Sequence, residues 1–444
     1  MEVTLPQMLE AREKRAERQK ALIREFGKPI VCFTMNIPGP IKDSPLIRRG
    51  FRAGLEELEH RLPQTALRIE ITEAITGCEG IYVVDMEPLA LKSVTAAIED
   101  DHSLGRLFDM DVIDTDLRKT DREAVGGGSR NCLVCGAPGR GCASRRVHSV
   151  EALQTATRHI LEGYFREKDG AFIGNLAVQS LLDEVCTTPK PGLVDRRNSG
   201  SHADMDISTF HTSAAALAGY YRNCGRIGIE TAGEAPAETF RQLRKVGLDA
   251  EQDMYAATGG VNTHKGAIFT LGLLCGAAGR LWKPEGSWNA EEICREVSEM
   301  TREAMEADFQ KGGSTVGQQL FAQQGIRGIR GQAAAGLPAV AELGLPVYRE
   351  ALERFRDKNA AGVHTLLTLI ANVEDTNMIH RGGLAGARAG AEKCAALLKT
   401  DYALSDVEVL DDQFIARNLS PGGCADLLAA VYFLHDLCEE TEVY

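Results

Sequence analysis

The feature that most constrains the fold of this chain of 444 residues is a change of hydrophobic periodicity near residue 165. Before that point, short apolar runs typical of strands alternate with helical patterns. After it, apolar residues recur almost everywhere at the three- and four-residue spacing of amphipathic helices. With ~100–200 residues per domain, this length predicts two or three domains. We expect an α+β domain at residues 1–167 and an all-α helical domain at residues 168–444.

The first domain is expected to contain several short strands. Leu67, Ile69 and Ile71 alternate with polar residues, which predicts a half-buried strand. The junction is expected near residues 148–170, where a helix over 150–165 ends at the charged stretch 166–170. The strands are predicted at residues 30–35, 66–76, 80–86 and 106–114, and further helices at 6–26 and 88–99.

The second domain is expected to be built from helices, with its chemistry in the loops between them. Glycine- and proline-containing loops separate the periodic segments. The helices are predicted at residues 176–185, 208–221, 237–257, 264–281, 290–306, 359–371, 386–398 and 425–437.

Composition excludes several classes of protein. Lys+Arg number 50 and Asp+Glu 63, a net charge of −13, which argues against broad electrostatic binding of nucleic acid or an anionic membrane. The N-terminus has no apolar run typical of a secretion signal, and the most apolar stretch, 267–279, is shorter than the ~18 residues of a membrane span. Twelve cysteines without a signal are typical of reduced thiols or metal ligands. We therefore expect a cytoplasmic protein.

Two aspartates in a predicted strand indicate a magnesium site. Asp109 and Asp111 are two residues apart, so their carboxylates lie on the same side of a strand. Mg²⁺ commonly binds one or two carboxylates together with substrate phosphates, and nearby Arg106 could bind a phosphate through two N–H groups. The alternative interpretation is an edge strand with solvated acids.

A cysteine and histidine cluster indicates a possible zinc site. The spacing C-x2-C-x6-C-x5-H could place three thiolates and an imidazole around Zn²⁺. The alternative is a reduced loop with incidental cysteines. The four candidate ligands are Cys132, Cys135, Cys142 and His148.

A loop rich in polar residues follows the first helix of the second domain. Three carboxylates within twelve residues would repel one another unless a cation lies among them. Asp206 has an alternative structural role as the N-cap of the next helix. The candidate residues of this loop are Lys190, Asp195, Asn198, His202, Asp204 and Asp206.

Two glycines and a lysine at the start of the helix predicted from residue 264 indicate a site for a polyphosphate. Gly259 and Gly260 allow close approach of the backbone, the helix N-terminus offers N–H groups, and Lys265 adds a positive charge. The segment is not a Walker A loop, because no strand precedes it. The residues assigned to binding here are Asn262, His264 and Lys265, with Glu374 and Asp375 beside Arg381 as further polar residues.

These motifs together resemble two known families. Residues 31–40 (VCFTMNIPGP), 105–112 (GRLFDMDV) and 131–148 (NCLVC…C…H) resemble citrate lyase holo-acyl-carrier-protein synthase. The remainder is similar to triphosphoribosyl-dephospho-CoA synthase, through residues 190–206 and the segments GGVNTHKGAIF (259–269), EDTN (374–377) and SPGGCADLLA (420–429). Since the first family resembles nucleotidyltransferases, a nucleotidyltransferase-like fold is implied for residues 1–167.

The resemblance implies two consecutive reactions. The second domain would join ATP to 3′-dephospho-CoA, releasing adenine and forming 2′-(5″-triphosphoribosyl)-3′-dephospho-CoA. The first would transfer phosphoribosyl-dephospho-CoA to a serine of the acyl carrier protein (γ subunit) of citrate lyase, releasing pyrophosphate.

The resemblance also implies roles for particular residues. Asp109 and Asp111 would hold Mg²⁺, and Arg106 a phosphate, in the first domain. In the second, Asp195, Asp204 or Asp206 would serve as general base and Mg²⁺ ligand, with Glu184 as a weaker candidate. Apart from the resemblance, Asp426 is a weaker candidate for catalysis, because the dipole of its predicted helix already favours an acid there. Lys190, His264 and Lys265 would hold the triphosphate, and Asn198, His202, Asn262, Glu374 and Asp375 would contact substrate.

Three alternatives remain open at this stage. The same chemistry serves malonate decarboxylase with a different carrier. Clustered acids around a ribosyl phosphate also suit a Mg²⁺-dependent hydrolase of the ADP-ribose type. The non-enzymatic alternative is a zinc-bearing scaffold that only binds nucleotide.

Overall fold

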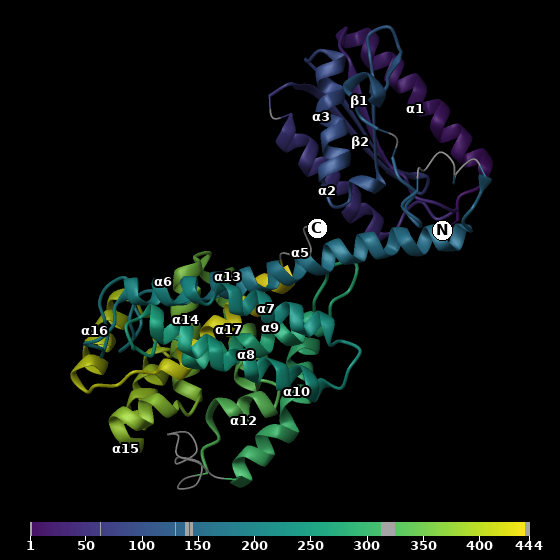
Figure 1. Cartoon of the computed structure of the whole chain (residues 1–444). Helices are drawn as coiled ribbons and strands as arrows, with labels where there is room; N and C mark the ends of the chain where they lie inside the picture. Colours follow the sequence, from purple (N-terminus) through teal and green to yellow (C-terminus); the bar gives the residue numbers. More distant parts are fainter. Residues whose placement is uncertain are drawn as a thin grey trace. The chain divides into compact units, whose positions relative to one another are not determined.

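The chain forms two compact units, Met1–Phe165 and Arg166–Tyr444. A computed structural model describes residues 2–62, 64–128, 130–137, 142, 145–311 and 325–439. Figure 1 shows helices together with a sheet in the first unit and helices in the second. The change of periodicity along the sequence therefore corresponds to a change of architecture, as predicted.

The first unit contains a five-stranded antiparallel sheet with the order β2-β3-β1-β4-β5. Its β1 spans the predicted residues without change. Its helices include α2, which was not predicted although Ser44 and Pro45 form an N-cap and first-turn pair. The strands are β1 Ile30–Met35, β2 Ala66–Ala74, β3 Gly77–Val84, β4 Phe108–Ile113 and β5 Lys119–Thr120, and the helices are α1 Leu5–Phe26, α2 Pro45–Arg61 and α3 Pro88–Asp101.

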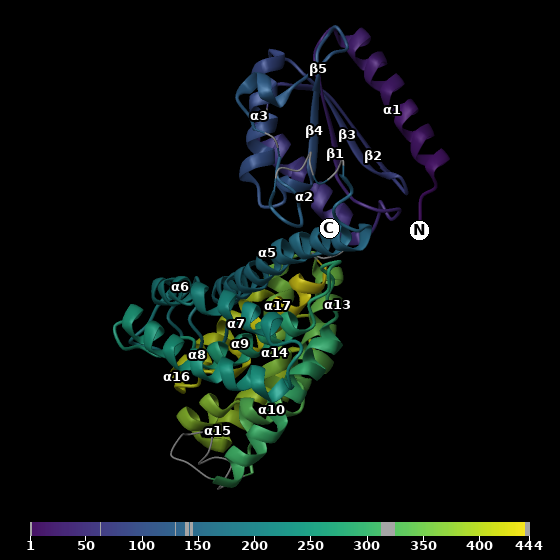
Figure 2. The same cartoon turned by 45° about the vertical axis from the view of Figure 1, so that its right-hand side comes forward.

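The helices of this unit cover both faces of the sheet. Leu22 and Ile23 of α1 pack on one face, against Ile30 and Cys32 of β1. On the opposite face lie α2 and α3 (Figure 2). Successive side chains of β1 point to opposite faces of the sheet, and helices cover both faces, so side chains on both sides of β1 are buried.

On the face covered by α2 and α3, an aromatic cluster forms the core. Phe33 of β1 stacks on Phe51 of α2 with ring centroids 4.8 Å apart and meets Phe108 of β4 edge-on at 5.2 Å. Phe108 therefore points to this face, which leaves the alternate residues of β4 on the other.

Two expectations for the strands were wrong in detail. Leu67, Ile69 and Ile71 share a face as predicted, but they are exposed by 50%, 40% and 49% because β2 lies at the sheet edge and the helices pack mainly on the inner strands. The strand expected from Arg106 begins at Phe108, since Arg106 lies in the short 3-10 helix η1, Gly105–Leu107.

The helix α5, Val150–Cys186, runs through the charged stretch where a break was expected. Charged residues continue a helix readily, and this stretch makes tertiary contacts that favour it. Asp169 accepts a 2.7 Å hydrogen bond from Trp282 Nε1, and the guanidinium of Arg166 lies 5.1 Å from the Trp282 ring centroid. The predicted end of a helix at residues 166–170 is therefore wrong.

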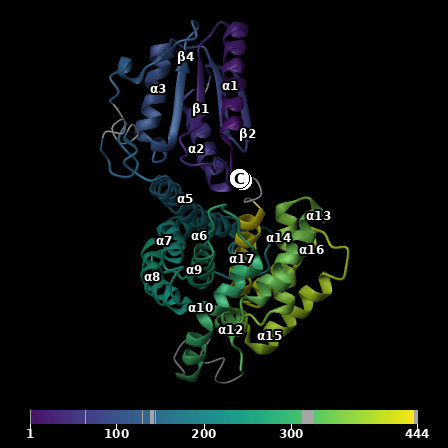
Figure 3. The same ribbon diagram turned by 90° about the vertical axis from the view of Figure 1, so that its right-hand side faces the viewer.

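The described residues of the second unit form helices joined by loops, with no strand among them. Helix α9 is buried on nearly all sides from Ala267 to Gly279, as expected for an apolar helix without a polar face, and it packs against α7, α8, α10 and α17 (Figure 3). The helices are α6 Ile207–Ala216, α7 Ala218–Glu230, α8 Pro236–Ala257, α9 Lys265–Arg280, α10 Ala290–Lys311, α12 Gly328–Ala334, α13 Leu345–Phe355, α14 Lys358–Asn372, α15 Thr376–Leu397, α16 Leu404–Ala416 and α17 Gly422–Glu439.

Among the described residues, no helix combines the length and the apolar character needed to cross a bilayer. All twelve cysteines have free thiols.

Candidate active sites

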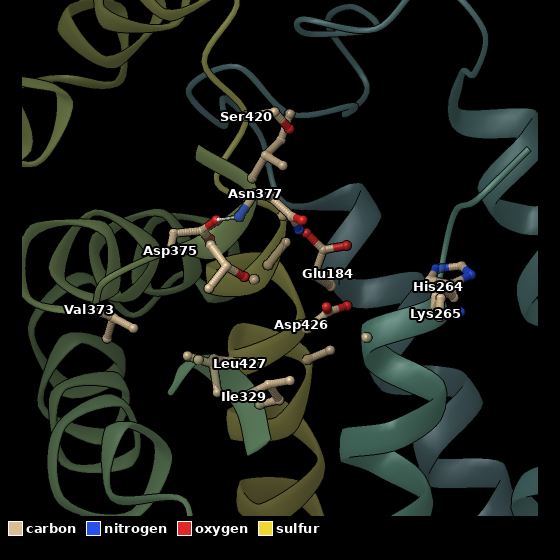
Figure 4. A pocket seen from close by; sticks show the side chains of 18 of the residues that line it. Glu184, His264, Lys265, Ile329, Val373, Asp375, Asn377, Ser420, Asp426 and Leu427 are labelled. Carbon is tan, nitrogen blue, oxygen red and sulfur yellow. Dashed lines mark hydrogen bonds between the residues drawn. The ribbon is translucent and has the colours of Figure 1, made fainter. Parts of the chain in front are cut away.

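A cavity of about 990 Å³ lies within the helical unit. The end of α5, the loop after it, the start of α9, the segment 372–377 and the start of α17 all contribute to its wall (Figure 4). Most of the predicted polar residues of this unit line it: Lys190, His202, Asp204, Asn262, His264, Lys265, Glu374 and Asp375.

Asp195, Asn198 and Asp206 are not among the lining residues of this cavity. Asp195 accepts hydrogen bonds from three backbone N–H groups of its own loop, at 2.7–3.1 Å. Asn198 donates to the buried Asp411 at 2.8 Å. Asp206 caps α6 by accepting from the Thr209 N–H at 2.9 Å, and this hydrogen bond lowers its pKa. These three residues organise the loop in the structure.

Lys190 forms a buried ion pair with Glu184. Its ammonium group donates to the Glu184 carboxylate and, at 2.8 Å, to the Glu184 backbone carbonyl. Lys190 is 1% exposed and Glu184 is likewise buried, although both contribute to the cavity wall. Much of the lysine's charge is therefore neutralised within the protein.

The N-terminus of α9 already holds a carboxylate from another helix. The Asp426 carboxylate of α17 lies against the first turn of α9, where a Cβ on Gly266 would lie 1.9 Å from Asp426 Oδ2. A larger residue at position 266 would therefore displace this carboxylate. The Lys265 ammonium pairs with Glu251 at 2.7 Å. The polyphosphate site predicted at this helix start stays a prediction.

His264 is buried in the cavity wall as a neutral imidazole. Burial, with a smaller contribution from the charge of Lys190, lowers its pKa to about 3. Its Nδ1 lies 2.7 Å from Ser213 Oγ, while its Nε2 has no hydrogen-bond partner within the described part of the chain. A neutral imidazole binds a ligand as a hydrogen-bonding group and contributes no positive charge.

Asp375 is fully buried and caps α15. Its carboxylate accepts from the N–H groups of Asn377, Met378 and Cys424 at 2.8–2.9 Å, so it joins the start of α15 to the start of α17. Burial raises its pKa, and these hydrogen bonds oppose the rise. The neighbouring Glu374 is exposed at the cavity rim.

Asp109 and Asp111 lie on one face of β4, as predicted. The buried Phe108, Met110 and Val112 occupy the opposite face. Surrounding protein and the neighbouring Asp111 carboxylate raise the pKa of Asp109, although its side chain reaches the surface. The strand therefore presents two oxygen donors to solvent side by side.

The cations nearest to this aspartate pair differ from the one that the sequence predicted. Lys119 of β5 pairs with Asp111 at 2.5 Å, and Arg130 acts electrostatically on Asp109. Arg106 lies instead among Arg122 and Arg130, where burial and these like charges lower its pKa. Lys119 is missed because the strand β5 has only two residues and gives no periodic signal.

Cys132, Cys135, Cys142 and His148 lie together, with one potential ligand atom from each within 4.8 Å of the others. Cys135 Sγ is 3.5 Å from Cys142 Sγ and 3.3 Å from His148 Nε2. Ligands at ~2.0–2.3 Å from a tetrahedral zinc lie about 3.3–3.8 Å apart. The cluster therefore has the donor set and the spacing of a structural zinc site.

Comparisons with known proteins divide the chain in the same place. A family model described as apo-citrate lyase phosphoribosyl-dephospho-CoA transferase matches residues 3–164. A second, described as ATP:dephospho-CoA triphosphoribosyl transferase, matches residues 171–443.

Full-length relatives contain both parts. The chain is 33% identical to a protein named CitXG from Leuconostoc mesenteroides subsp. cremoris, with 97% of each chain covered. It is also 33% identical to CitXG of Haemophilus influenzae, with 97% of this chain and 96% of the relative covered. The 2-(5″-triphosphoribosyl)-3′-dephosphocoenzyme-A synthase of Klebsiella pneumoniae is 42% identical over 58% of this chain and 87% of its own length.

Proposed function

Because the chain belongs to the CitXG family of fusion proteins, we propose that its two units carry out the two consecutive steps that mature citrate lyase. The chain is a bifunctional transferase. Its second part forms 2′-(5″-triphosphoribosyl)-3′-dephospho-CoA from ATP and 3′-dephospho-CoA, with release of adenine. Its first part attaches phosphoribosyl-dephospho-CoA to apo-citrate lyase, with release of pyrophosphate. We place the domain boundary between residues 167 and 168, within α5.

The acceptor that we propose is a serine of the citrate lyase acyl carrier protein. A serine hydroxyl attacks the α-phosphorus, and pyrophosphate leaves. Phosphoryl transfer of this kind depends on positioning and on neutralising the charge of the phosphates. We also propose a cytoplasmic location, because free thiols are typical of proteins in a reducing compartment.

The carboxylates of β4 suit a magnesium ion in the transfer reaction. Asp109 and Asp111 offer hard oxygen donors on one face of a strand, and Mg²⁺ held there would neutralise negative charge on the triphosphate. Lys119 and Arg130 add positive charge to the same surface. Arg106, in η1 just before this strand, is proposed to bind a phosphate. We also propose that this antiparallel sheet belongs to a nucleotidyltransferase-like fold.

The cavity of the helical unit is our proposed site for ATP and 3′-dephospho-CoA. Lys265, Asn262 and His202 at its wall are proposed to contact the substrates, and the neutral His264 to donate or accept a hydrogen bond. Asp204 at the rim is a candidate ligand for a magnesium ion that accompanies ATP. Asp195, Asp206 and Asn198 are proposed to act through the loop that they organise.

The Cys/His cluster is our proposed site for a structural zinc ion. Three thiolates and one imidazole at tetrahedral spacing are a common ligand set for zinc. The segment that carries the cluster is attached to β4: Arg130, two residues before Cys132, donates to the Phe108 carbonyl at 2.6 Å and to the Gly105 carbonyl. Zinc would therefore order a segment that contacts the strand of the aspartate pair.

The match of two family models to consecutive parts of one chain carries this proposal, and loading of a carrier protein tests it. The purified chain is incubated with ATP, Mg²⁺, 3′-dephospho-CoA and apo-carrier protein of citrate lyase. Mass spectrometry is expected to show phosphoribosyl-dephospho-CoA on the carrier and free adenine in solution. The Asp109→Ala variant is expected to release adenine normally but to leave the carrier unloaded.

Other outcomes would contradict the proposal. Loading of malonate decarboxylase carrier in preference to citrate lyase carrier would identify the parallel maturation pathway. Free triphosphoribose in place of the CoA adduct would identify a hydrolase. Absence of adenine would leave only a nucleotide-binding scaffold.

A further inference from the structure

Three acids from separate segments meet at the cavity of the helical unit. Glu184 comes from the end of α5, Asp375 from the N-cap of α15 and Asp426 from the fifth residue of α17. Figure 4 shows the three side chains at the wall of this cavity. Asp375 already accepts three backbone N–H groups, which fixes it in a structural role. Glu184 and Asp426 are the two that we consider for chemistry.

The arrangement of these acids differs from that of a preformed metal cage. Within the described residues, the Cys/His cluster is the one group of three or more potential ligands whose atoms all lie within 4.8 Å of one another. The oxygens of Glu184, Asp375 and Asp426 do not meet that criterion. Carboxylates that flank a glycosidic bond during cleavage lie ~5–9.5 Å apart, because the substrate fits between them.

The two acids lie in different electrostatic environments. The ammonium of Lys190 bonds directly to the Glu184 carboxylate. Asp426 makes no ion pair with the residues that the structure describes, and it faces Glu184 and Asp375. Burial and the two neighbouring carboxylates raise its pKa well above its ordinary value. Two carboxyl groups held in different environments can serve as an acid and a base in one reaction.

An independent feature of the same wall indicates that a polar ligand binds here. His264 is 3% exposed, and its Nε2 has no hydrogen-bond partner among the described residues. A buried polar nitrogen without a partner is costly unless a ligand completes its hydrogen bond. A nucleotide in this cavity offers such partners on its base, sugar and phosphates.

We propose that Asp426 and Glu184 are the acid and the base that exchange adenine for 3′-dephospho-CoA on the ribose of ATP. Asp426 donates a proton to a ring nitrogen of adenine as the bond between C1′ and N9 breaks. Glu184 accepts the proton of the ribose hydroxyl of 3′-dephospho-CoA as its oxygen bonds to the same carbon. The net change moves one proton from the hydroxyl to adenine. This inference rests on the proposed function of the helical unit.

The proposal places the acid on a residue that the sequence indicated only weakly. The sequence predicts Asp426 in the first turn of a helix, where the helix dipole favours an acid and a structural role is the ordinary interpretation. In the structure α17 begins at Gly422, so Asp426 lies beyond its first turn. Its position against Gly266 of α9 is a tertiary feature, which no local pattern encodes. Asp204 and Asp206, which belong to the loop motif, are exposed, whereas Asp426 is partly buried.

The test compares Asp426→Asn and Glu184→Gln with the unchanged full-length chain. Adenine release from ATP and 3′-dephospho-CoA is followed by chromatography, and general acid–base groups typically contribute ~10²–10⁴-fold to such rates. We expect each variant to lose at least 100-fold in kcat, on the same principle, while ATP binding measured by calorimetry stays within a few-fold. Asp169→Asn, a buried acid of α5 outside the cavity lining, is the matched control and is expected to keep the unchanged rate.

A change of leaving group separates an acid from a merely structural residue. ATP whose adenine is methylated at N7 carries a positive charge on the base and needs no protonation to leave. Asp426→Asn is expected to regain most of its lost rate with this nucleotide, whereas Glu184→Gln is not. The rate of the unchanged chain is expected to fall at alkaline pH as Asp426 loses its proton, and Asp426→Asn to lose this dependence.

The results that overturn the inference differ from those that overturn the function. If the unchanged chain releases adenine and either variant keeps more than half of that rate, or if Asp426→Asn slows both nucleotides equally, the acid–base assignment is wrong. If the unchanged chain itself releases no adenine, the proposed function fails first. Thermal melting curves establish that each variant is folded.

Discussion

At the scale of single residues, His264 shows how burial changes the chemistry that a residue offers. Beside Lys265 at the start of a helix, it was expected to hold a triphosphate. In the structure its imidazole is enclosed, contacts Ser213, and packs edge-on against Phe210 with ring centroids 4.9 Å apart. Burial lowers its pKa to about 3, so it is neutral at physiological pH. It is therefore suited to a hydrogen bond and cannot act as a counter-ion.

The same shift predicts a loss of stability in acid. The pKa of His264 is about 3 in the folded chain and near 6.5 when unfolded, so the unfolded chain binds more protons between these values. Its contribution to the free energy of unfolding is fully present above pH 6.5 and decreases as the pH falls toward 3. Between pH 7.5 and 5.0 we expect a loss of about 2 kcal/mol from this group.

Urea unfolding of the unchanged chain and of His264→Gln measures this difference. The fluorescence of Trp282 and Trp288 reports on the helical unit, since both tryptophans of the chain lie there. His264→Gln is expected to lose less stability between pH 7.5 and 5.0 than the unchanged chain. The control His380→Gln, at an exposed histidine, is expected to lose as much stability as the unchanged chain. An equal loss in His264→Gln and the unchanged chain would contradict the prediction.

At the scale of elements, Arg130, two residues before Cys132, connects the proposed zinc site to β4. Arg130 bonds to two carbonyl groups at the start of this strand and lies 3.8 Å from the Glu99 carboxylate of α3. The Glu99 carboxylate in turn accepts from the Met110 N–H at 2.8 Å. A disturbance of the Cys/His cluster would therefore reach the strand that carries the aspartate pair.

This connection predicts a selective effect of removing zinc. The full-length chain is expected to contain about one equivalent of zinc, and Cys135→Ser to contain little, because a structural site needs all four ligands. Cys135→Ser is expected to load the carrier more slowly from ready-made triphosphoribosyl-dephospho-CoA but to release adenine at the normal rate. Elemental analysis and mass spectrometry measure the two quantities.

Cys186→Ser, at the end of α5 and outside the cluster, is the matched control and should keep both zinc and loading. A full zinc content in Cys135→Ser would contradict the proposed zinc site. An unchanged loading rate in the zinc-free variant would contradict the proposed effect of zinc on loading.

At the scale of the whole molecule, each unit has hydrophobic contacts of its own. Within the first unit, Leu161 of α5 packs near Gly50 of α2, and the Arg49 guanidinium lies 4.1 Å from the Phe165 ring centroid. Within the second, Ile173 of the same helix is fully buried in the main core of the helical unit. Different stretches of α5 therefore belong to different cores.

Separate expression of the two units tests this division. Residues 166–444 alone are expected to release adenine, and residues 1–165 alone to load the carrier from ready-made intermediate. The tryptophan fluorescence of the fragment 166–444 gives its unfolding curve. This curve is expected to match the transition that the same fluorescence reports in the full chain. Activity that appears only when the fragments are mixed would show that the units depend on each other.

Local patterns in the sequence were enough to locate part of the secondary structure and to indicate the family. Periodicity located β1, α1, α8, α9, α14 and α17 within three residues at each end, because burial of one face repeats apolar residues at a fixed spacing. The helix predicted at 208–221 is two helices, α6 and α7, and α12, α13 and α16 were not predicted. The alternation in β4 placed Asp109 and Asp111 on one side for the same reason. Short motifs with fixed spacing carried the resemblance to both transferase families, which the comparisons bear out.

Tertiary structure alone decided which polar residues share a cavity and in what state. Asp195 and Asp206 looked like active-site acids in the sequence, but nearby N–H groups engage them in the structure. Asp426 and Glu184 meet at the cavity from helices more than 200 residues apart, and burial sets the proton affinity of Asp426 and His264. Local patterns encode hydrogen bonds to neighbours in the chain, whereas desolvation and the approach of distant charges arise only when the helices pack.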